Sequence, residues 1–127
     1  MTYQFHHLHL ICSDLEKTIK FFSEVLGAKF VTRRKFGAAE GATFDFNGTG
    51  IYLRAAREDD KITGDSTRTH YGYSHIGLKV ENLGEAFAEL TKKGFIFTQP
   101  PRVSGTRKMA FFNGPDNISI ELVQDIN

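Results

Sequence analysis

The chain has 127 residues, about the size of one ordinary domain. Its composition, 40% hydrophobic and 24% charged with 12 Phe residues, excludes a disordered tail or a disulfide scaffold and supplies enough bulk for a core. Sixteen Lys and Arg against fifteen Asp and Glu leave a net charge of +1. The basic excess typical of nucleic-acid-binding proteins is missing, so we expect no nucleic-acid partner.

The cysteine content and the hydropathy pattern bear on where the protein works. Cys12 is the single cysteine, and its apolar setting indicates a buried thiol in a reducing compartment. No stretch approaches 18 continuous apolar residues, and residues 1–11 lack a basic segment followed by a long apolar one. We therefore expect a soluble, cytoplasmic protein with no membrane partner.

An internal repeat organises the chain. Residues 5–15 align with residues 73–83, which places His7 over His75 and Asp14 over Asn82. Each copy predicts a short strand that leads directly into a capped helix. The turn signal Phe-Asn-Gly at residues 46–48 also recurs at residues 112–114, before the last strand of each copy.

Capping signals and apolar spacing define one helix in each copy. In the first, Ser13 is expected to be the N-cap, with Glu16 three residues later completing a capping box. In the second, Asn82 is the expected N-cap, with Glu85 three residues later. An apolar stripe follows in both helices, and a glycine ends each of them: Leu15, Ile19, Phe22, Leu26 and Gly27 in the first; Leu83, Phe87, Leu90 and Gly94 in the second.

Strand-like runs follow each predicted helix. They cover residues 29–33, 41–46 and 50–55 in the first copy and residues 95–99, 107–112 and 118–123 in the second. The polar stretch 57–70 between the copies shows no hydrophobic periodicity and is expected to be a connection. The predicted fold is therefore α+β, a single domain 1–127 built of two tandem βαβββ modules, 1–56 and 71–127. Because each module is small, we expect the two to pair within one chain or across a homodimer.

Three residues at matching places in the modules have side chains that bind metals. His7 and His75 belong to the first strands, and Glu121 lies on the last strand of the second module. Two imidazoles and one carboxylate are a common ligand set for Zn²⁺, Mn²⁺ or Fe²⁺, and they leave coordination sites open. The alternative interpretation is two ordinary strand histidines and an exposed strand glutamate.

Four blocks of the sequence, residues 7–15, 21–27, 75–80 and 114–122, resemble the vicinal-oxygen-chelate superfamily. That superfamily contains glyoxalase I, bleomycin-resistance proteins, extradiol dioxygenases, methylmalonyl-CoA epimerase and fosfomycin-modifying enzymes. The resemblance implies a cupped mixed sheet and one divalent metal ion (Fe²⁺, Mn²⁺, Zn²⁺ or Ni²⁺) bound by His7, His75 and Glu121. It also makes a homodimer the expected assembly.

Two positions depart from the family's patterns. Tyr52 stands where glyoxalase I-like members place Glu and epimerase-like members place Gln. The four-ligand set of glyoxalase I is therefore incomplete, and the remaining three resemble the dioxygenase and fosfomycin-modifying branches. Phe111 stands where the fosfomycin branch would place an active-site Tyr.

Strand alternation suggests which side chains accompany the metal ligands. His9 shares a strand face with His7, about 6–7 Å along, and is the candidate catalytic base. A hydrogen-bonding role in the cavity wall is the alternative for His9. Tyr52 and Arg54 share one face of a later strand. The candidate substrate-binding residues are Tyr52, Arg54, Arg107 and Phe111, with Lys108 beside them.

The leading hypothesis is a divalent-metal-dependent enzyme acting on a small molecule that presents one or two oxygens to the metal. Its reaction would be of the lyase or isomerase, thiol transferase, or dioxygenase type. The alternative is a non-catalytic protein of the bleomycin-resistance type, which binds and sequesters a small molecule.

Overall fold

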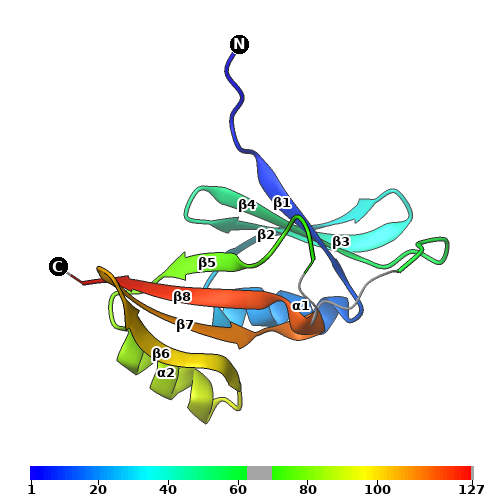
Figure 1. Ribbon diagram of the computed structural model, residues 1–127. Coiled ribbons are helices and arrows are strands. Elements are labelled where there is room, and N and C mark those ends of the chain that lie inside the picture. The colour runs from blue at the N-terminus through cyan, green and yellow to red at the C-terminus, as the bar shows by residue number, and fades with distance from the viewer. Residues whose placement is uncertain (63–69, 127) are drawn as a thin grey trace. The chain divides into compact units, whose positions relative to one another are not determined.

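The computed structural model describes residues 1–62 and 70–126. The chain divides into two compact units, Met1–Thr63 and Gly64–Asn127. Each unit contains one four-stranded mixed sheet and one main helix (Figure 1). The expected pair of βαβββ modules is therefore confirmed. Part of the predicted connection, residues 63–69, lies outside the described residues.

The first module begins with a strand and a helix and continues with three antiparallel strands. Strand β1 runs parallel to β4, and the sheet order is β1-β4-β3-β2. A π-helical segment, η1, extends the first helix. The elements are β1 (His7–Cys12), α1 (Leu15–Lys20), η1 (Phe21–Val25), β2 (Lys29–Phe36), β3 (Ala39–Phe46) and β4 (Thr49–Ala55).

The second module repeats this topology. Strand β5 runs parallel to β8, and the sheet order is β5-β8-β7-β6. A 3₁₀ turn, η2, precedes the last strand. The elements are β5 (Ile76–Lys79), α2 (Leu83–Lys92), β6 (Phe97–Ser104), β7 (Arg107–Asn113), η2 (Pro115–Asn117) and β8 (Ser119–Asp125).

The strand registers of the two modules correspond residue by residue at the centre of each sheet. His9 of β1 lies beside Tyr52 of β4, and Gly77 of β5 lies beside Glu121 of β8. Because His9 and Gly77 each stand two residues after an aligned histidine, Tyr52 and Glu121 occupy equivalent positions.

Each helix has an N-cap side chain, but the cap of α1 lies one residue later than predicted. Asp14, not Ser13, is the N-cap of α1: its Oδ1 accepts a hydrogen bond from the Lys17 backbone N–H at 3.1 Å. The prediction of Ser13 was therefore wrong, because Asp is an equally good cap and the strand continues to Cys12. Asn82 caps α2 as expected, accepting from the Glu85 N–H at 3.0 Å.

The edge strands differ most from the predicted ranges. β2 extends to Phe36, because it forms a long hairpin with β3. β6 begins only at Phe97 and continues to Ser104 through Pro100 and Pro101. These prolines lie in a register shift between Gln99 and Arg102, on the sheet edge where a missing N–H is tolerated.

One face of each sheet is covered by that module's helix. α1 packs against β3 and β4, and α2 packs against β6, β7 and β8. The fully buried large side chains lie between them: Phe22, Phe44 and Leu53 in the first module; Leu83, Phe112 and Ile120 in the second. Burying a side chain of this size contributes about 1.5–3 kcal/mol. The opposite face of each sheet is not covered by that module's helix, and the side chains on it are described below as the candidate site.

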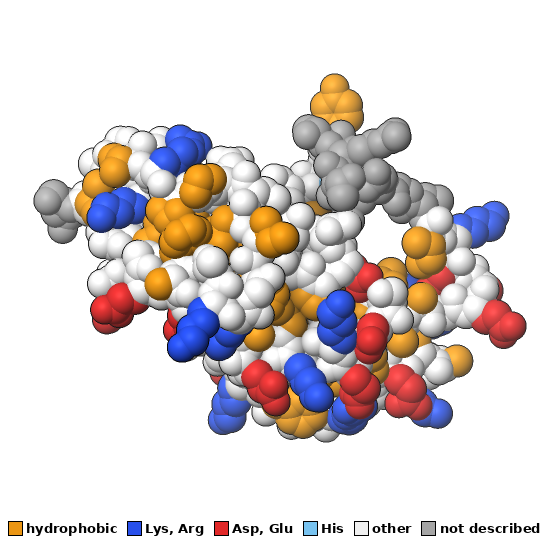
Figure 2. All heavy atoms as spheres, turned by 90° about the horizontal axis from the view of Figure 1, so that it is seen from below, with side chains coloured by type: hydrophobic (Ala, Val, Ile, Leu, Met, Phe, Trp, Pro, Cys, Tyr) orange, Lys and Arg blue, Asp and Glu red, His pale blue; other side chains and the backbone are white. Residues whose placement is uncertain are grey.

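The visible surface carries mixed charge. Lys and Arg are interspersed with Asp and Glu on the face shown in Figure 2, consistent with the net charge of +1. Among the described residues, no helix is long and apolar enough to cross a membrane.

Candidate functional site

The predicted site residues other than Lys108 lie on the sheet faces opposite the helices, one group in each module. The first-module face carries side chains from β1, β2 and β4: His7, His9, Arg34, Phe36, Tyr52 and Arg54. The second-module face carries His75, Arg107, Phe111 and Glu121. Alternation along the strands places each member of a group on the same side of its sheet.

His75 and Glu121 are brought together on the second-module face. The distance between His75 Nε2 and Glu121 Oε1 is 3.2 Å. The Ser74 hydroxyl lies 2.9 Å from His75 Nδ1, so the second ring nitrogen also has a hydrogen-bond partner. The carboxylate is more buried than the imidazole, with 16% and 32% of the side chains exposed. Two atoms that can bind a metal, one nitrogen and one oxygen from distant parts of the sequence, therefore lie close together. The Ser74 contact supports the orientation of the His75 ring.

Phe111 and Arg107 lie on the same face of β7. The Phe111 ring meets His75 edge to face, with centroids 5.0 Å apart, and it stands opposite Glu121 in the strand register. Arg107 is exposed and lies opposite Asp125, whose Oδ1 is 3.9 Å from its Nε. Lys108 follows Arg107 directly in the strand, so its side chain points to the opposite face of the sheet.

His7 stacks on Tyr52 on the first-module face. Their ring centroids are 4.0 Å apart and the planes differ by 10°. His7 Nδ1 lies 2.8 Å from His6 Nδ1, so Nε2 is the ring nitrogen of His7 that remains for binding a metal. His7 and His75 thus each use Nδ1 for a contact with the preceding residue, as the repeat would predict.

His9 lies among the aromatic rings of His7, Phe36 and Tyr52, and we call these four rings the aromatic wall. Its centroid is 4.5 Å from that of Phe36, 5.8 Å from Tyr52 and 6.0 Å from His7. Burial lowers the pKa of His9, and the neighbouring charges of His7, Arg54, Arg57 and Arg34 lower it further. The ring makes no hydrogen bond within the described part of the chain, so a nitrogen lone pair is available to accept a proton.

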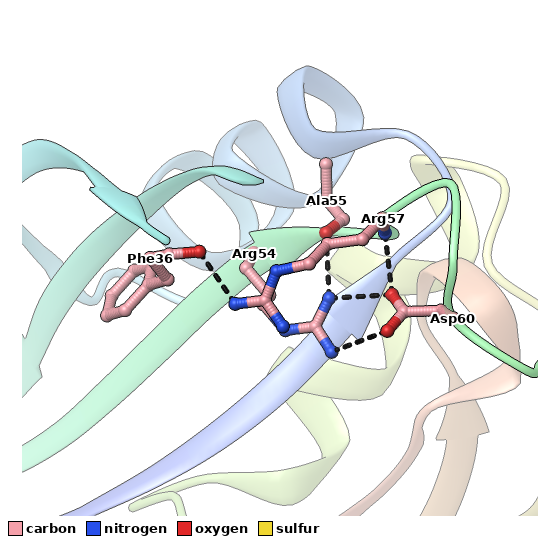
Figure 3. A network of polar contacts seen from close by, with 5 residues as sticks. All are labelled: Phe36, Arg54, Ala55, Arg57 and Asp60. Carbon is pink, nitrogen blue, oxygen red and sulfur yellow. Dashed lines mark hydrogen bonds and ion pairs between the residues drawn. The ribbon is translucent and has the colours of Figure 1, made fainter. Parts of the chain in front are cut away.

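Arg54 is engaged by a carboxylate that the sequence analysis did not consider. Its Nη1 and Nη2 lie 2.8 and 3.3 Å from the two oxygens of Asp60, and Nη1 also donates to the Ala55 carbonyl (Figure 3). Only 12% of the Arg54 side chain and 18% of the Asp60 side chain are exposed. The Arg54 guanidinium is thus held by the loop after β4.

Asp60 also fixes Arg57, which in turn reaches the end of β2. The Arg57 backbone N–H donates to Asp60 Oδ2 at 2.6 Å, and its Nη2 donates to the Phe36 carbonyl at 2.6 Å (Figure 3). The hydrogen bonds from Arg54 and from the Arg57 N–H lower the pKa of Asp60 to about 2, and the hydrogen bonds that Arg54 donates to Asp60 raise the pKa of Arg54. This network anchors the loop beside the aromatic wall.

Besides Asp60 and Arg57, two residues of the first-module face escaped the sequence analysis. Phe36 was outside the predicted strand, and Arg34 was not considered although alternation along a longer β2 would have placed it on this face. Within the described ranges 1–62 and 70–126, no three His, Cys, Asp or Glu side chains converge closely enough to hold a metal ion. The converging pair is His75 and Glu121.

Sequence comparison finds relatives over nearly the whole chain. The chain is 30% identical to a lactoylglutathione lyase of Schizosaccharomyces pombe over 96% of its length, and it spans 47% of that longer protein. It is also 30% identical to a lactoylglutathione lyase of Neisseria meningitidis, covering 93% of this chain and 88% of that protein.

Structural comparison agrees with the fold. A glyoxalase family protein from Bacillus cereus matches with a TM-score of 0.84, covering 100% of this chain and 97% of that chain at 19% identity. An antibiotic-binding protein from Streptomyces matches with a TM-score of 0.73 at 17% identity, covering 98% and 97% of the two chains. The fosfomycin resistance protein FosX from Mesorhizobium loti matches with a TM-score of 0.70 at 20% identity, covering 96% and 91%.

The two modules, their matching registers and these likenesses agree with a family model that matches residues 4–122. The chain belongs to the glyoxalase/bleomycin resistance protein/dioxygenase superfamily.

Proposed function

We propose that the protein is a divalent-metal-dependent enzyme acting on a small molecule that presents oxygen atoms to the metal. The observation that carries this proposal is the convergence of His75 Nε2 and Glu121 Oε1 at 3.2 Å on one sheet face. Imidazole nitrogen and carboxylate oxygen suit Zn²⁺, Mn²⁺, Fe²⁺ or Ni²⁺. The Ser74 contact at Nδ1 is the kind of outer interaction that orients a metal-binding histidine.

His7 is the proposed third ligand. It aligns with His75 in the repeat, its Nδ1 is occupied by His6, and its Nε2 remains for coordination. Three protein ligands leave positions for substrate oxygens. The modules supplying them would pair within one chain or between two chains, and we propose a homodimer.

When bound, the ion would supply Lewis-acid stabilisation of negative charge on substrate oxygens. We propose His9 as the group that takes up a substrate proton at a ring nitrogen; in support, the ring has no hydrogen-bond partner among the described residues and its centre is 6.0 Å from that of His7. Phe36 and Tyr52 flank His9 and would keep water from one side of the reacting group. Phe111 would do the same beside His75.

The reaction type is proposed as lyase or isomerase, thiol transferase, or dioxygenase. The lactoylglutathione lyase relatives favour the first of these. Tyr52 argues against glyoxalase I with its full four-ligand set, because a phenol stacked on His7 replaces the carboxylate that resemblance to that enzyme would require.

The second candidate function is sequestration of a small molecule without catalysis. The aromatic wall favours it, since the rings of His7, Phe36 and Tyr52 lie together on one sheet face. Such a surface can bind a planar ligand by stacking, with no metal involved.

The test is a titration of chelator-treated protein with Mn²⁺, in which electron paramagnetic resonance measures the concentration of free Mn²⁺. Wild-type protein should show one saturable site per chain. His75→Ala should lose it, while the matched control His70→Ala, outside both sheets, should keep it. Circular dichroism checks that both variants fold. Absence of any saturable site for Mn²⁺, and for Zn²⁺, Ni²⁺ and Fe²⁺ by equilibrium dialysis, would contradict the enzyme proposal and favour the second candidate.

A further inference from the structure

Strand β2 carries three consecutive cationic residues whose surroundings differ. Arg33 pairs with Glu16 of α1, and Lys35 Nζ lies 3.7 Å from Glu40 Oε1 on β3. Arg34 has no carboxylate partner within the described part of the chain. Because alternate residues of a strand point to opposite faces, Arg34 projects away from the face on which Arg33 meets the helix.

Arg34 lies against the aromatic wall of the first-module face. Its guanidinium carbon is 4.7 Å from the centre of the Phe36 ring. Phe36 in turn contacts His9, with centroids 4.5 Å apart, and Tyr52, with centroids 5.8 Å apart. Opposite Arg34 in the register is Gly41, which has no side chain to cover it. The guanidinium therefore sits at one end of a row of rings that leads to His7.

The other arginines beside this wall already have partners. Arg54 makes two contacts with Asp60 and is largely buried. Arg57 donates to the Phe36 carbonyl oxygen at 2.6 Å. The Asp60 carboxylate would repel an anionic ligand from Arg54, and the hydrogen bond to the Phe36 carbonyl oxygen restrains the guanidinium of Arg57. The Arg34 guanidinium has neither restriction.

We propose that Arg34 is a specificity-determining residue that binds an oxyanion, carboxylate or phosphate, of a small ligand whose flat part lies beside Phe36 and Tyr52. A guanidinium presents a planar fork of donors that matches the two oxygens of such a group. Contact with the Phe36 ring holds the fork beside the wall. This inference rests on the proposed function only in taking the first-module face as the substrate side, and it makes the substrate class anionic.

The test measures binding of three probes to the full chain by titration followed with amide NMR shifts. Benzoate and phenyl phosphate carry an oxyanion on a flat ring, and benzamide is the neutral counterpart of benzoate. The protein is treated with chelator, so that an anion does not bind through a metal. The variants are Arg34→Met, which keeps an apolar stem of similar length, and Arg33→Met, which removes a charge from the opposite face of the same strand.

The expected result is that wild-type protein binds at least one of the two anions about fivefold or more tightly than benzamide. Arg34→Met should lower that affinity to the benzamide level without changing benzamide binding, and Arg33→Met should preserve the preference. A carboxylate preference and a phosphate preference identify the two sources of the oxyanion, and both support the proposal.

The proposal is overturned if neither anion is preferred, if the preference survives in Arg34→Met, or if Arg33→Met removes it equally. These outcomes are independent of the Mn²⁺ titration. Loss of the anion preference with an intact metal site would refute only the role of Arg34, and absence of a metal site with a preserved anion preference would refute only the metal-dependent enzyme.

Discussion

Tyr52 occupies in the first module the position that Glu121 occupies in the second. Tyr52 lies beside the second residue after His7 in the register, as Glu121 lies beside the second residue after His75. Yet Tyr52 stacks on its histidine with centroids 4.0 Å apart, whereas the Glu121 carboxylate oxygen lies 3.2 Å from the histidine nitrogen. The repeat has thus kept both histidines and diverged at their partners. This asymmetry is why we propose three ligands and not four.

Replacing Tyr52 with glutamate should restore the missing fourth donor. Tyr52→Glu places a carboxylate beside His7, as Glu121 stands beside His75, and an added carboxylate ligand should raise Mn²⁺ affinity by about tenfold or more. Competition with a chelator of known affinity measures the change. Tyr71→Glu, at a fully exposed position outside both sheets, is the matched control and should leave the affinity unaltered. Equal affinity in wild type and Tyr52→Glu would mean that position 52 does not face the metal.

Acidification should weaken the anchor that Asp60 provides. Its pKa is about 2 in the folded protein, below its ordinary value of 3.8, because of hydrogen bonds from Arg54 and the Arg57 N–H. A carboxyl group with a lowered pKa stabilises the folded state fully above 3.8, and this contribution is lost as the pH falls from about 3.8 through about 2.

Asp60→Asn measures that contribution. The free energy of unfolding by urea should be lower in the variant than in wild type at pH 7 and pH 5, by the same amount. The difference should shrink between pH 4 and pH 2. The matched control is Asp59→Asn, which removes the neighbouring carboxylate and leaves the hydrogen bonds of Asp60 in place. A difference for Asp60→Asn that stays constant down to pH 2 would show that the carboxylate is not engaged by Arg54.

Gly41 allows the Phe36 ring to lie over the sheet. A Cβ atom there would meet the Leu53 carbonyl oxygen and come within 2.6 Å of the Phe36 ring carbons. Gly41→Ala should therefore displace the ring and lower the free energy of unfolding by about 1–3 kcal/mol. Thermal or urea unfolding provides the measurement.

The matched control is Gly84→Ala in the first turn of α2. There the nearest atom to the new Cβ is Asn82 Oδ1 at 3.4 Å, an ordinary contact. This substitution should raise stability by about 0.4–1 kcal/mol through the entropy of the unfolded chain. If Gly41→Ala were as well tolerated as Gly84→Ala, the Phe36 ring would not be packed on Gly41.

The repeat made most of the fold predictable from sequence. Alignment of His7 with His75 gave the two modules, and both helix ends at Gly27 and Gly94 are confirmed by their positive φ values of 76° and 96°. The errors lie where local signals compete. Ser13 and Asp14 are both good caps, and Asp14 is the cap because the helix begins at Leu15.

The candidate site was less predictable, because its contacts are set by loops and edges. Strand alternation grouped His9 with His7 and Tyr52 with Arg54, as the structure has them. The pairing of Arg54 with Asp60 depends on the conformation of the loop after β4, which has no periodic signal. Arg34 and Phe36 were missed because β2 continues for three residues beyond the predicted range 29–33.

The most direct test of the central claim is the metal content of protein purified without chelator, measured by plasma mass spectrometry. We predict about one divalent metal ion per chain in wild type and in His70→Ala, with Fe²⁺, Mn²⁺, Zn²⁺ or Ni²⁺ as its identity. The metal should be lost from His7→Ala, His75→Ala and Glu121→Gln alike. Metal that is retained in all three variants, or that is missing from wild type even after reconstitution with each ion, would contradict the proposed site.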